Sequence, residues 1–186
     1  MMLLMKLAAP AETPTLWVTG FADGVRAECE TAGVQLIGGD TTSAPLIVIT
    51  ATVLADLDGR APVTRGGARP GQVVAMAGRI GWAAAGVAVL GRGFRSPRAV
   101  VLAHRVPEPP YGAGRVAALA GASALIDVSD GLLADLGHVA RRSGVTIDLA
   151  SAAFEVAEHK GLNRSQVWSA GGVEPGVEIH GCKGCG

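Results

Sequence analysis

Short apolar segments with two different periodicities, separated by glycine and proline, most constrain the fold of this chain. Between residues 13 and 33, apolar side chains recur every four residues, at Trp17, Phe21, Val25 and Cys29. This spacing predicts an amphipathic helix. Segment 46–57 is instead rich in β-branched residues and ends at an Asp-Gly turn, which predicts a strand. Because helices and strands mix without regular alternation, the sequence favours an α+β fold.

Further short elements are expected in the same irregular order. The pattern predicts strands at 34–37, 73–77, 124–128 and 145–149, and helices at 81–90, 97–105, 112–120 and 132–142. The small apolar side chains of the helix at 81–90 predict that it is buried. Segment 38–42 is expected to be a glycine-rich turn after a strand. Beyond residue 154 the periodicity fades, so segment 155–186 is predicted to be an irregular tail.

The composition excludes a disordered chain and gives no electrostatic reason to expect a nucleic-acid partner. Hydrophobic residues make up 49% of the chain and charged residues only 17%, which is too apolar a balance for intrinsic disorder. The 16 basic side chains are matched by 16 acidic ones, so there is no net positive charge to attract a phosphate backbone. Arginine far outnumbers lysine, which favours forked contacts to phosphate or carboxylate groups.

Membrane and secreted classes also find little support in the sequence. No apolar run reaches the roughly 20 residues of a membrane helix. The first ten residues superficially resemble a signal peptide, but Lys6 interrupts their apolar core. Cys29, Cys182 and Cys185 do not make a disulfide framework. We therefore expect a cytoplasmic protein with no membrane partner. Cys182 and Cys185 have zinc-like spacing, but a four-ligand site needs two more ligands, for which His159 and His180 are the candidates.

The strongest candidate site lies at residues 126–132, where a predicted strand meets a predicted helix. Asp127 lies near the strand end, and Ser129 and Asp130 follow before the helix. Strand periodicity places Asp127 and Ser129 on one side, and the turn brings Asp130 back toward them. Two carboxylates and a hydroxyl at a helix N-terminus suit Mg²⁺ held against phosphate oxygens. The alternative is structural: Ser129 or Asp130 caps the helix, and Asp127, on a buried strand, accepts bonds from backbone donors.

Two further glycine-rich segments carry groups that suit a phosphate. In the first, Gly39 allows a ligand close to the backbone and Asp40 can reach a metal, although Gly-Gly-Asp is also ordinary turn chemistry. In the second, Arg65 and Arg69 suit a polyphosphate, but equally a solvated surface. The first of these segments is not a Walker loop, because the lysine and the long glycine spacing are absent.

Taken in order, these motifs resemble those of the thiamine-monophosphate kinase family. The series is Gly-Gly-Asp-Thr, Thr-Arg-x-Gly-Ala-x-Pro-Gly, Gly-x-x-Ala-Ala-Gly and Asp-x-Ser-Asp-Gly-Leu-x-x-Asp-Leu, at residues 38–41, 64–71, 81–86 and 127–136. The segment Arg-Val-Pro-Glu-Pro-Pro-Tyr at 105–111 is also similar to the family. The resemblance runs from about residue 10 to residue 149. The wider superfamily includes aminoimidazole ribonucleotide synthetase and selenophosphate synthetase.

The resemblance implies a domain organisation. A partial N-terminal β-sheet and helix domain that binds ATP and metal is expected at 1–63. A partial C-terminal α/β sandwich domain of the aminoimidazole ribonucleotide synthetase-like type is expected at 64–154, before the tail at 155–186. The family's upstream acidic segment and its downstream Gly-Gly-Glu-Asp segment are absent from the sequence, so the chain is expected to be truncated at both ends. A homodimer through the N-terminal domain is also implied.

The resemblance further implies an activity and its residues. The family phosphorylates thiamine monophosphate from ATP, giving thiamine diphosphate, with Mg²⁺. Carried over by position, Gly39, Asp40, Arg65 and Ser129 contact ATP, while Asp40, Asp127 and Asp130 bind magnesium. No side-chain nucleophile is expected, because the substrate phosphate itself attacks. The alternative is a catalytically inactive chain that at most binds a nucleotide or dimerises.

Four other polar residues are expected to have structural roles. Asp135 belongs to the family pattern, but inside a helix it is expected to pair with an arginine rather than bind metal. His104 and His138 lie on predicted helices and are expected to be surface or packing residues. Gln72 replaces an aspartate that is usual in the family, which is expected to be a structural change at a strand entry.

Overall fold

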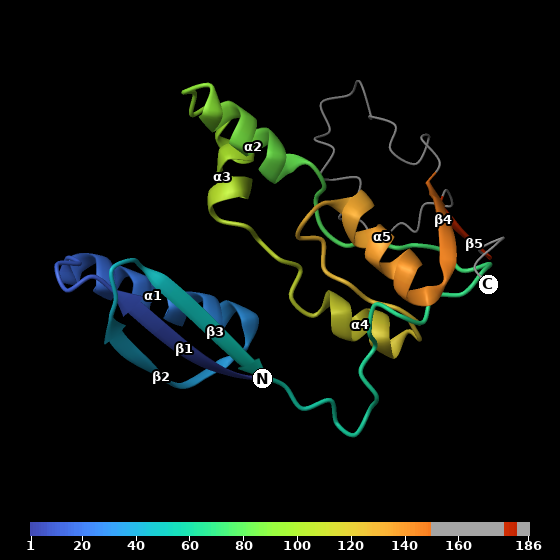
Figure 1. The fold of residues 1–186 in the computed structure, drawn as a ribbon, viewed down its shortest axis with the longest axis horizontal. Coiled ribbons are helices and arrows are strands. Elements are labelled where there is room, and N and C mark those ends of the chain that lie inside the picture. The colour runs from blue at the N-terminus through green and yellow to red at the C-terminus, as the bar shows by residue number, and fades with distance from the viewer. Residues whose placement is uncertain (150–176, 182–186) are drawn as a thin grey trace. The chain divides into compact units, whose positions relative to one another are not determined.

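The chain divides into two units, Met1–Pro62 and Val63–Gly186. The computed structural model describes residues 1–149 and 177–181 (Figure 1). Both units mix helices and strands, so the protein is of the α+β class that the sequence predicts. No helix in the described residues is long and apolar enough to cross a membrane.

The first unit is a three-stranded sheet with a helix on one face. Its elements are β1 (Met2–Ala9), α1 (Thr15–Ala32), β2 (Gln35–Ser43) and β3 (Val48–Leu54). The strand order is β2-β1-β3, with β1 parallel to β2 and antiparallel to β3. The helix ends where Gly33 adopts φ 65°, a left-handed conformation that favours glycine and closes a helix by bonding back to its last turn.

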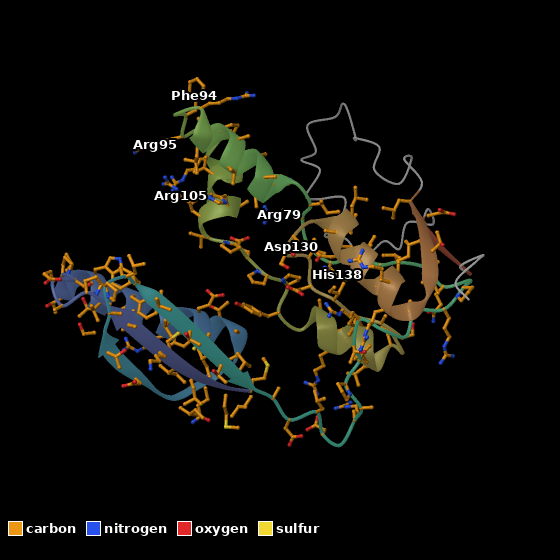
Figure 2. All side chains as sticks on the ribbon, viewed as in Figure 1. Arg79, Phe94, Arg95, Arg105, Asp130 and His138 are labelled. Carbon is orange, nitrogen blue, oxygen red and sulfur yellow. The ribbon has the colours of Figure 1, made fainter. Side chains whose placement is uncertain are left out.

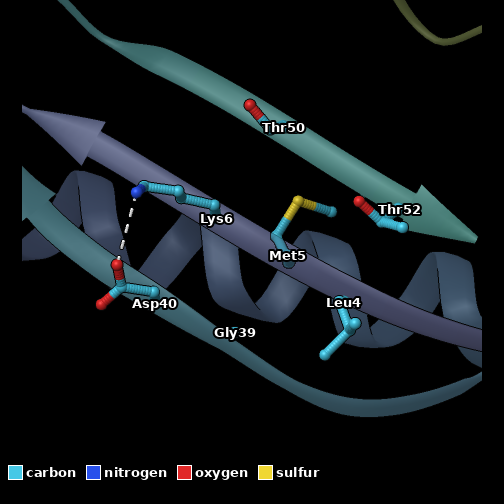
Figure 3. A pocket seen from close by; sticks show the side chains of 7 residues that line it. All are labelled: Leu4, Met5, Lys6, Gly39, Asp40, Thr50 and Thr52. Atoms are coloured by element: carbon cyan, nitrogen blue, oxygen red, sulfur yellow. Dashed lines mark ion pairs between the residues drawn. The ribbon is translucent and has the colours of Figure 1, made fainter.

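Strand β1 is the centre of this sheet, although its sequence predicts no strand. Its buried side chains alternate, with Leu3, Leu7 and Ala9 buried on one face and Lys6 exposed on the other. This two-residue period is the signature of a strand with one covered face. The helix α1 lies behind the sheet and covers that face (Figure 3).

Strand β2 includes the segment 38–42, which the sequence predicts as a turn. Gly38 and Gly39 pair with Leu4 and Met5 of β1, and the register shifts by one residue just before this pair. A Cβ atom on Gly39 would overlap the carbonyl oxygen of Met5, so glycine is required there by the approach of the neighbouring strand. The turn prediction was therefore wrong: the glycines serve strand pairing at a bulge.

The second unit contains four helices and a two-stranded sheet in its described residues. They are α2 (Trp82–Gly91), α3 (Arg98–Arg105), α4 (Ala113–Leu119), α5 (Leu132–Ser143), β4 (Val145–Leu149) and β5 (Val177–Gly181). β4 and β5 pair antiparallel. Strand β5 lies in the segment for which the sequence predicted no regular structure. The helix α2 was expected to be buried, but Gly86, which packs on α3, is its one buried residue.

Two predicted strands of this unit, 73–77 and 124–128, are not strands. Val74, Ala124 and Ile126 nevertheless pack against a small buried core of Ala68, Val139 and Val145. The apolar residues of these segments are used in packing; Val73 makes an isolated bridge, and neither segment forms a strand in the described residues. Leu125 donates its N–H to the Thr64 carbonyl, 2.9 Å away, which joins the segment to the loop before Arg65.

Candidate functional site

The segment that leads into α5 brings three polar side chains together. Asp130, Asp135 and His138 each offer a ligand atom within 4.8 Å of the others. Figure 2 shows Asp130 and His138 near the N-terminal half of α5. Asp135 and His138 are three positions apart on the helix, which puts them on one face, and Asp130 lies just before the helix. Gly131, at φ 110°, makes the turn between them.

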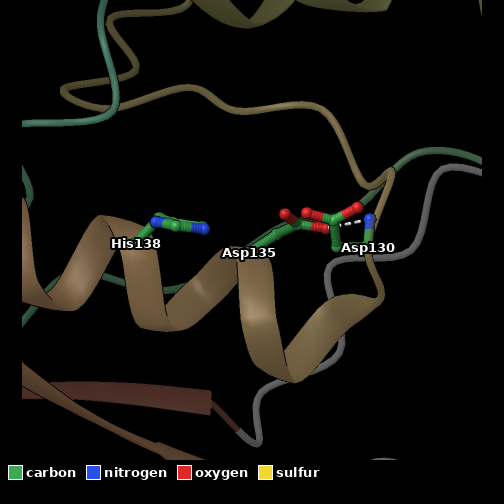
Figure 4. Close-up of side chains that lie close together, drawn as sticks. All are labelled: Asp130, Asp135 and His138. Carbon is green, nitrogen blue, oxygen red and sulfur yellow. Dashed lines mark hydrogen bonds between the residues drawn. The ribbon is translucent and has the colours of Figure 1, made fainter.

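Asp135 is the buried member of this cluster, with 3% of its surface exposed. Its Oδ2 atom accepts the backbone N–H of Asp130 at 3.2 Å (Figure 4). The predicted pairing with an arginine is not seen among the described residues, where Asp135 makes no ion pair. His138 instead lies beside an arginine: the guanidinium of Arg141 is 3.1 Å from His138 Nδ1.

The other two residues of the motif, Asp127 and Ser129, are exposed. Asp127 was expected on a buried strand that needs a partner, but it is exposed and, among the described residues, its segment forms no strand. It is also outside the cluster of ligand atoms. The structural alternative, in which Ser129 or Asp130 caps the helix, was wrong as well. The N-cap residue is Gly131, and no side chain makes a capping hydrogen bond there.

The loop at residues 64–71, called the Arg65 loop below, is fixed to the C-terminal end of α5. The hydroxyl of Ser143 accepts the N–H groups of Gly67 and Ala68, each at 3.1 Å, and lies 3.5 Å from the Arg65 carbonyl oxygen. A Cβ atom on Gly67 would overlap the carbonyl oxygen of Ser123. The backbone of the loop is therefore held, while the Arg65 side chain is exposed.

Gln72 closes the same loop from its other side. Its Oε1 atom accepts the N–H of Arg69 at 2.8 Å and the hydroxyl of Ser123 at 2.7 Å. No extended strand begins at this position, although Val73 beside it makes an isolated bridge, and the Gln72 side chain ties the loop to segment 123–125. This substitution of the family's usual aspartate is thus compatible with a purely structural role.

Gly39 and Asp40 lie in the first unit, on β2. Asp40 is opposite Lys6 of β1, and their charged groups are 3.5 Å apart (Figure 3). Both side chains are more than half exposed, so this pair contributes little stability. They line a shallow depression of about 300 Å³ on the open face of the sheet, together with Leu4, Met5, Gly39, Thr50 and Thr52.

The sequence-predicted site residues therefore fall into two groups. Gly39 and Asp40 belong to Met1–Pro62, whereas Arg65 and the motif at 127–130 belong to Val63–Gly186. Within the second unit, the buried residue that supports Asp130 was missed. The signal that could have found it is the position of Asp135, a carboxylate on the same helix face as the core residues Leu136 and Val139.

The remaining metal candidates divide between described and undescribed residues. Cys182, Cys185 and His159 lie outside the described residues, and so does the side chain of His180. Cys29 is buried in α1. His104 is exposed on α3, as expected for a surface residue. Among the described residues, the Asp130, Asp135 and His138 group is the only cluster of at least three potential metal ligands.

Residues 1–56 match the family model of the AIR synthase related protein, N-terminal domain. Over 146 residues the chain is 49% identical to the thiamine-monophosphate kinase of Mycobacterium tuberculosis, a match that covers 78% of this chain and 44% of the relative. The solved structure of thiamine monophosphate kinase from Aquifex aeolicus has a TM-score of 0.71 at 29% identity, covering 81% of this chain and 52% of that one. A structure described as "AaThiL complexed with AMPPCP and TMP" has a TM-score of 0.71 at 24% identity, covering 97% of this chain and 61% of that one.

The sheet-and-helix unit and these likenesses define a protein of the AIR synthase related class. Within this class the chain is similar to the thiamine-monophosphate kinases over most of its length. It spans about half the length of the relatives it matches.

Proposed function

We propose that this chain carries part of the ATP- and magnesium-binding site of a thiamine-monophosphate kinase. The observation that carries the proposal is the presentation of Asp130 beside the buried Asp135, at the motif that relates this chain to that family. The reaction is transfer of the γ-phosphoryl group of ATP to thiamine monophosphate, which gives thiamine diphosphate and ADP. AMPPCP, an ATP analogue, and TMP are the ligands named for a structural neighbour.

The donor chemistry fits magnesium. Asp127 and Asp130 offer exposed carboxylate oxygens, and Asp40 offers another in the first unit. Hard oxygen donors are the ligands that Mg²⁺ prefers. When bound, the metal neutralises charge on the phosphate oxygens during transfer. Asp40 is held beside Lys6, so its carboxylate can turn to a metal at little cost in stability.

The residues of this chain hold the phosphate groups in place and neutralise their charge, and they do not react covalently. The exposed Arg65 guanidinium, on a backbone fixed by Ser143, offers forked donors to phosphate oxygens. The Ser129 hydroxyl and the Gly39 backbone supply further contacts to ATP. A phosphate oxygen of the acceptor attacks the γ-phosphorus, and the bond to the β-phosphate oxygen breaks. No side chain needs to form a covalent intermediate.

The proposal predicts that MgATP binding depends on the motif carboxylates. Isothermal titration of MgATP compares the wild-type chain with Asp127→Asn and Asp130→Asn variants. Each variant is expected to bind about tenfold more weakly or worse, because a ligand to the metal–phosphate complex is lost. Asp148→Asn, an exposed aspartate on β4, is the matched control and is expected to bind like the wild type. Equal affinities for all four proteins would reject the assignment.

A second candidate is an inactive nucleotide-binding or dimerising module. It is favoured by the exposed edge strands β2 and β3 of the first unit, because open sheet edges are surfaces through which sheets associate. An assay for thiamine diphosphate formation separates the two candidates. Turnover by the wild-type chain that is lost in Asp130→Asn supports the kinase, whereas MgATP binding without turnover supports the module. In either case we propose a homodimer through the first unit.

A further inference from the structure

Asp135 is the one charged side chain that is buried among the described residues. Removing a carboxylate from water is costly unless donors or a counter-charge compensate for it. Asp135 has no ion pair in the described part of the chain. Its observed partner is the backbone N–H of Asp130, 3.2 Å from Oδ2. The donor that stabilises this buried carboxylate in the described residues therefore belongs to the motif segment.

The motif segment has few other restraints. Residues 127–130 are exposed and belong to no helix or strand. Among the described residues, the bond from the Asp130 N–H to Asp135 is the single hydrogen bond that holds this stretch to the rest of the protein. At its C-terminal end Gly131, with φ 110°, provides a flexible joint to α5. Without Asp135, the carboxylate of Asp130 would be attached to a segment free to take several conformations.

The surroundings of His138 argue against direct metal ligation by the whole cluster. Arg141 is always charged and can only donate, so the Nδ1 atom of His138 is the acceptor of their 3.1 Å contact. A neutral His138 then carries its proton on Nε2, which leaves that nitrogen without a lone pair for a metal. Two carboxylates alone remain, and one of them already holds the backbone of the other.

We propose that Asp135 is a positioning residue, which holds the 127–130 segment by accepting the Asp130 N–H and so presents the Asp130 carboxylate to a metal–phosphate complex. This inference rests on the proposed function for the role of Asp130. It makes Asp135 neither a metal ligand nor a group that touches substrate. Groups that orient metal ligands in this way typically change metal affinity when they are removed.

The hydrogen bond is tested first, without nucleotide or metal. Backbone amide resonances of the intact chain are compared for the wild type, Asp135→Ala, Asp135→Asn and the control Val139→Ala. Val139 is buried on the same helix, in the cluster against which Ile126 packs, and its side chain cannot hydrogen-bond to residues 127–130, so its truncation reports general loosening of α5. Asp135→Ala is expected to speed solvent exchange of the Asp130 amide and increase fast motion at 127–130. Asp135→Asn keeps an acceptor oxygen and is expected to behave like the wild type, as is Val139→Ala at the motif.

Two results would overturn the inference at this stage. One is an Asp130 amide in folded Asp135→Ala that exchanges as in the wild type. The other is an Asp135→Asn variant that is folded but frees the segment, since its amide oxygen can still accept the bond. The second outcome remains decisive should Asp135→Ala fail to fold.

The consequence for metal is tested with Mn²⁺, whose paramagnetic broadening of the Asp130 resonances gives a dissociation constant. Asp135→Ala is expected to weaken binding about tenfold or more, and Asp135→Asn about twofold at most. Equal weakening in both variants would overturn positioning in favour of direct ligation by the Asp135 charge. Loss of order at 127–130 in Asp135→Ala, with no Mn²⁺ binding by the wild type, would retain the positioning bond and reject the proposed function instead.

Discussion

Gly39 illustrates how one residue can match a ligand-binding motif and still be required by packing. It faces Met5 on the neighbouring strand, where any Cβ atom would overlap the Met5 carbonyl oxygen. Its backbone is in a region that other residues also adopt, so the restriction comes from the neighbouring strand rather than from φ. A loss of ATP binding in a Gly39 variant therefore has to be separated from a loss of the sheet.

Gly39→Ala is predicted to destabilise the chain by about 1–3 kcal/mol, because β1 and β2 must separate to admit the methyl group. Gly24→Ala is the matched control: Gly24 is exposed in α1, and its new Cβ meets nothing within 4 Å. That change is expected to stabilise the helix by up to about 1 kcal/mol, since alanine has the higher helix propensity. Denaturant unfolding followed by circular dichroism measures both. A Gly39→Ala midpoint at or above that of the wild type would contradict the packing argument.

At the scale of elements, α5 connects the two parts of the candidate site in the second unit. Its first turns hold Asp130 through Asp135, and its last residue, Ser143, holds the Arg65 loop. The core residues Leu136 and Val139 fix the helix between these ends. A change at either end of α5 is therefore expected to reach a different part of the same phosphate-binding chemistry.

Ser143→Ala tests the second of these connections. The substitution leaves the N–H groups of Gly67 and Ala68 without their acceptor, and Ala68 is buried, so we expect a loss of about 1–3 kcal/mol. MgATP affinity is expected to fall as the Arg65 backbone becomes mobile. Thr31→Ala, which removes one exposed hydroxyl bond to the Ala27 carbonyl in α1, is the control and should be near neutral. Unfolding and titration curves for Ser143→Ala that match those of the control would refute the role of Ser143 in holding the loop.

The helices could be predicted from the sequence, and so could β3, β4 and the start of β2, whereas β1 and β5 could not. All five helices lie within two residues of their predicted bounds, because their apolar spacing and glycine ends are local signals. The predictions at 73–77 and 124–128 rested on β-branched and apolar content alone. That content indicates burial, and in the described residues the two segments pack around Ala68 without forming an extended strand. Strand β1 was missed because its alternation is hidden by apolar residues on both faces.

The candidate site was predicted in part from its motif. The prediction that Asp130 lies just before α5 was correct, because the apolar run, the glycine and the helix pattern around it are signals from neighbouring residues. The role of Asp135 could not be seen, because it depends on which helix face is buried and on the backbone direction of the preceding segment. The predicted burial of Asp127 was wrong for the same reason: in the described part of the chain no strand pairs with its segment, and the side chain is exposed.

At the scale of the whole molecule, the first unit leaves much apolar surface uncovered. Every residue of β2 and β3 is exposed, and these two strands are the edges of the sheet. Met2, Leu4 and Leu54 lie on the face away from α1, 37–47% exposed. Open edges and uncovered apolar faces are the features through which sheets associate. This surface is the physical argument for the proposed homodimer.

The dimer is predicted to depend on this face of the sheet. Light scattering after gel filtration is expected to give a mass of about twice the 18.7 kDa of the chain. Leu54→Lys places a charge on the apolar face and is expected to give a monomer at the same concentration, because burying an unpaired ammonium group is costly. Leu133→Lys is the matched control, since Leu133 is 74% exposed on α5 in the other unit and is expected to leave the dimer intact.

Circular dichroism of both variants separates dissociation from unfolding. A folded Leu54→Lys protein that stays dimeric would place the interface elsewhere. A wild-type chain that is monomeric at tens of micromolar would refute the dimer itself, and self-association would then no longer account for the exposed apolar residues of β3. A monomeric Leu54→Lys protein that still binds MgATP would show that each copy binds its nucleotide independently. One that loses binding would show that the partner's sheet supports the site.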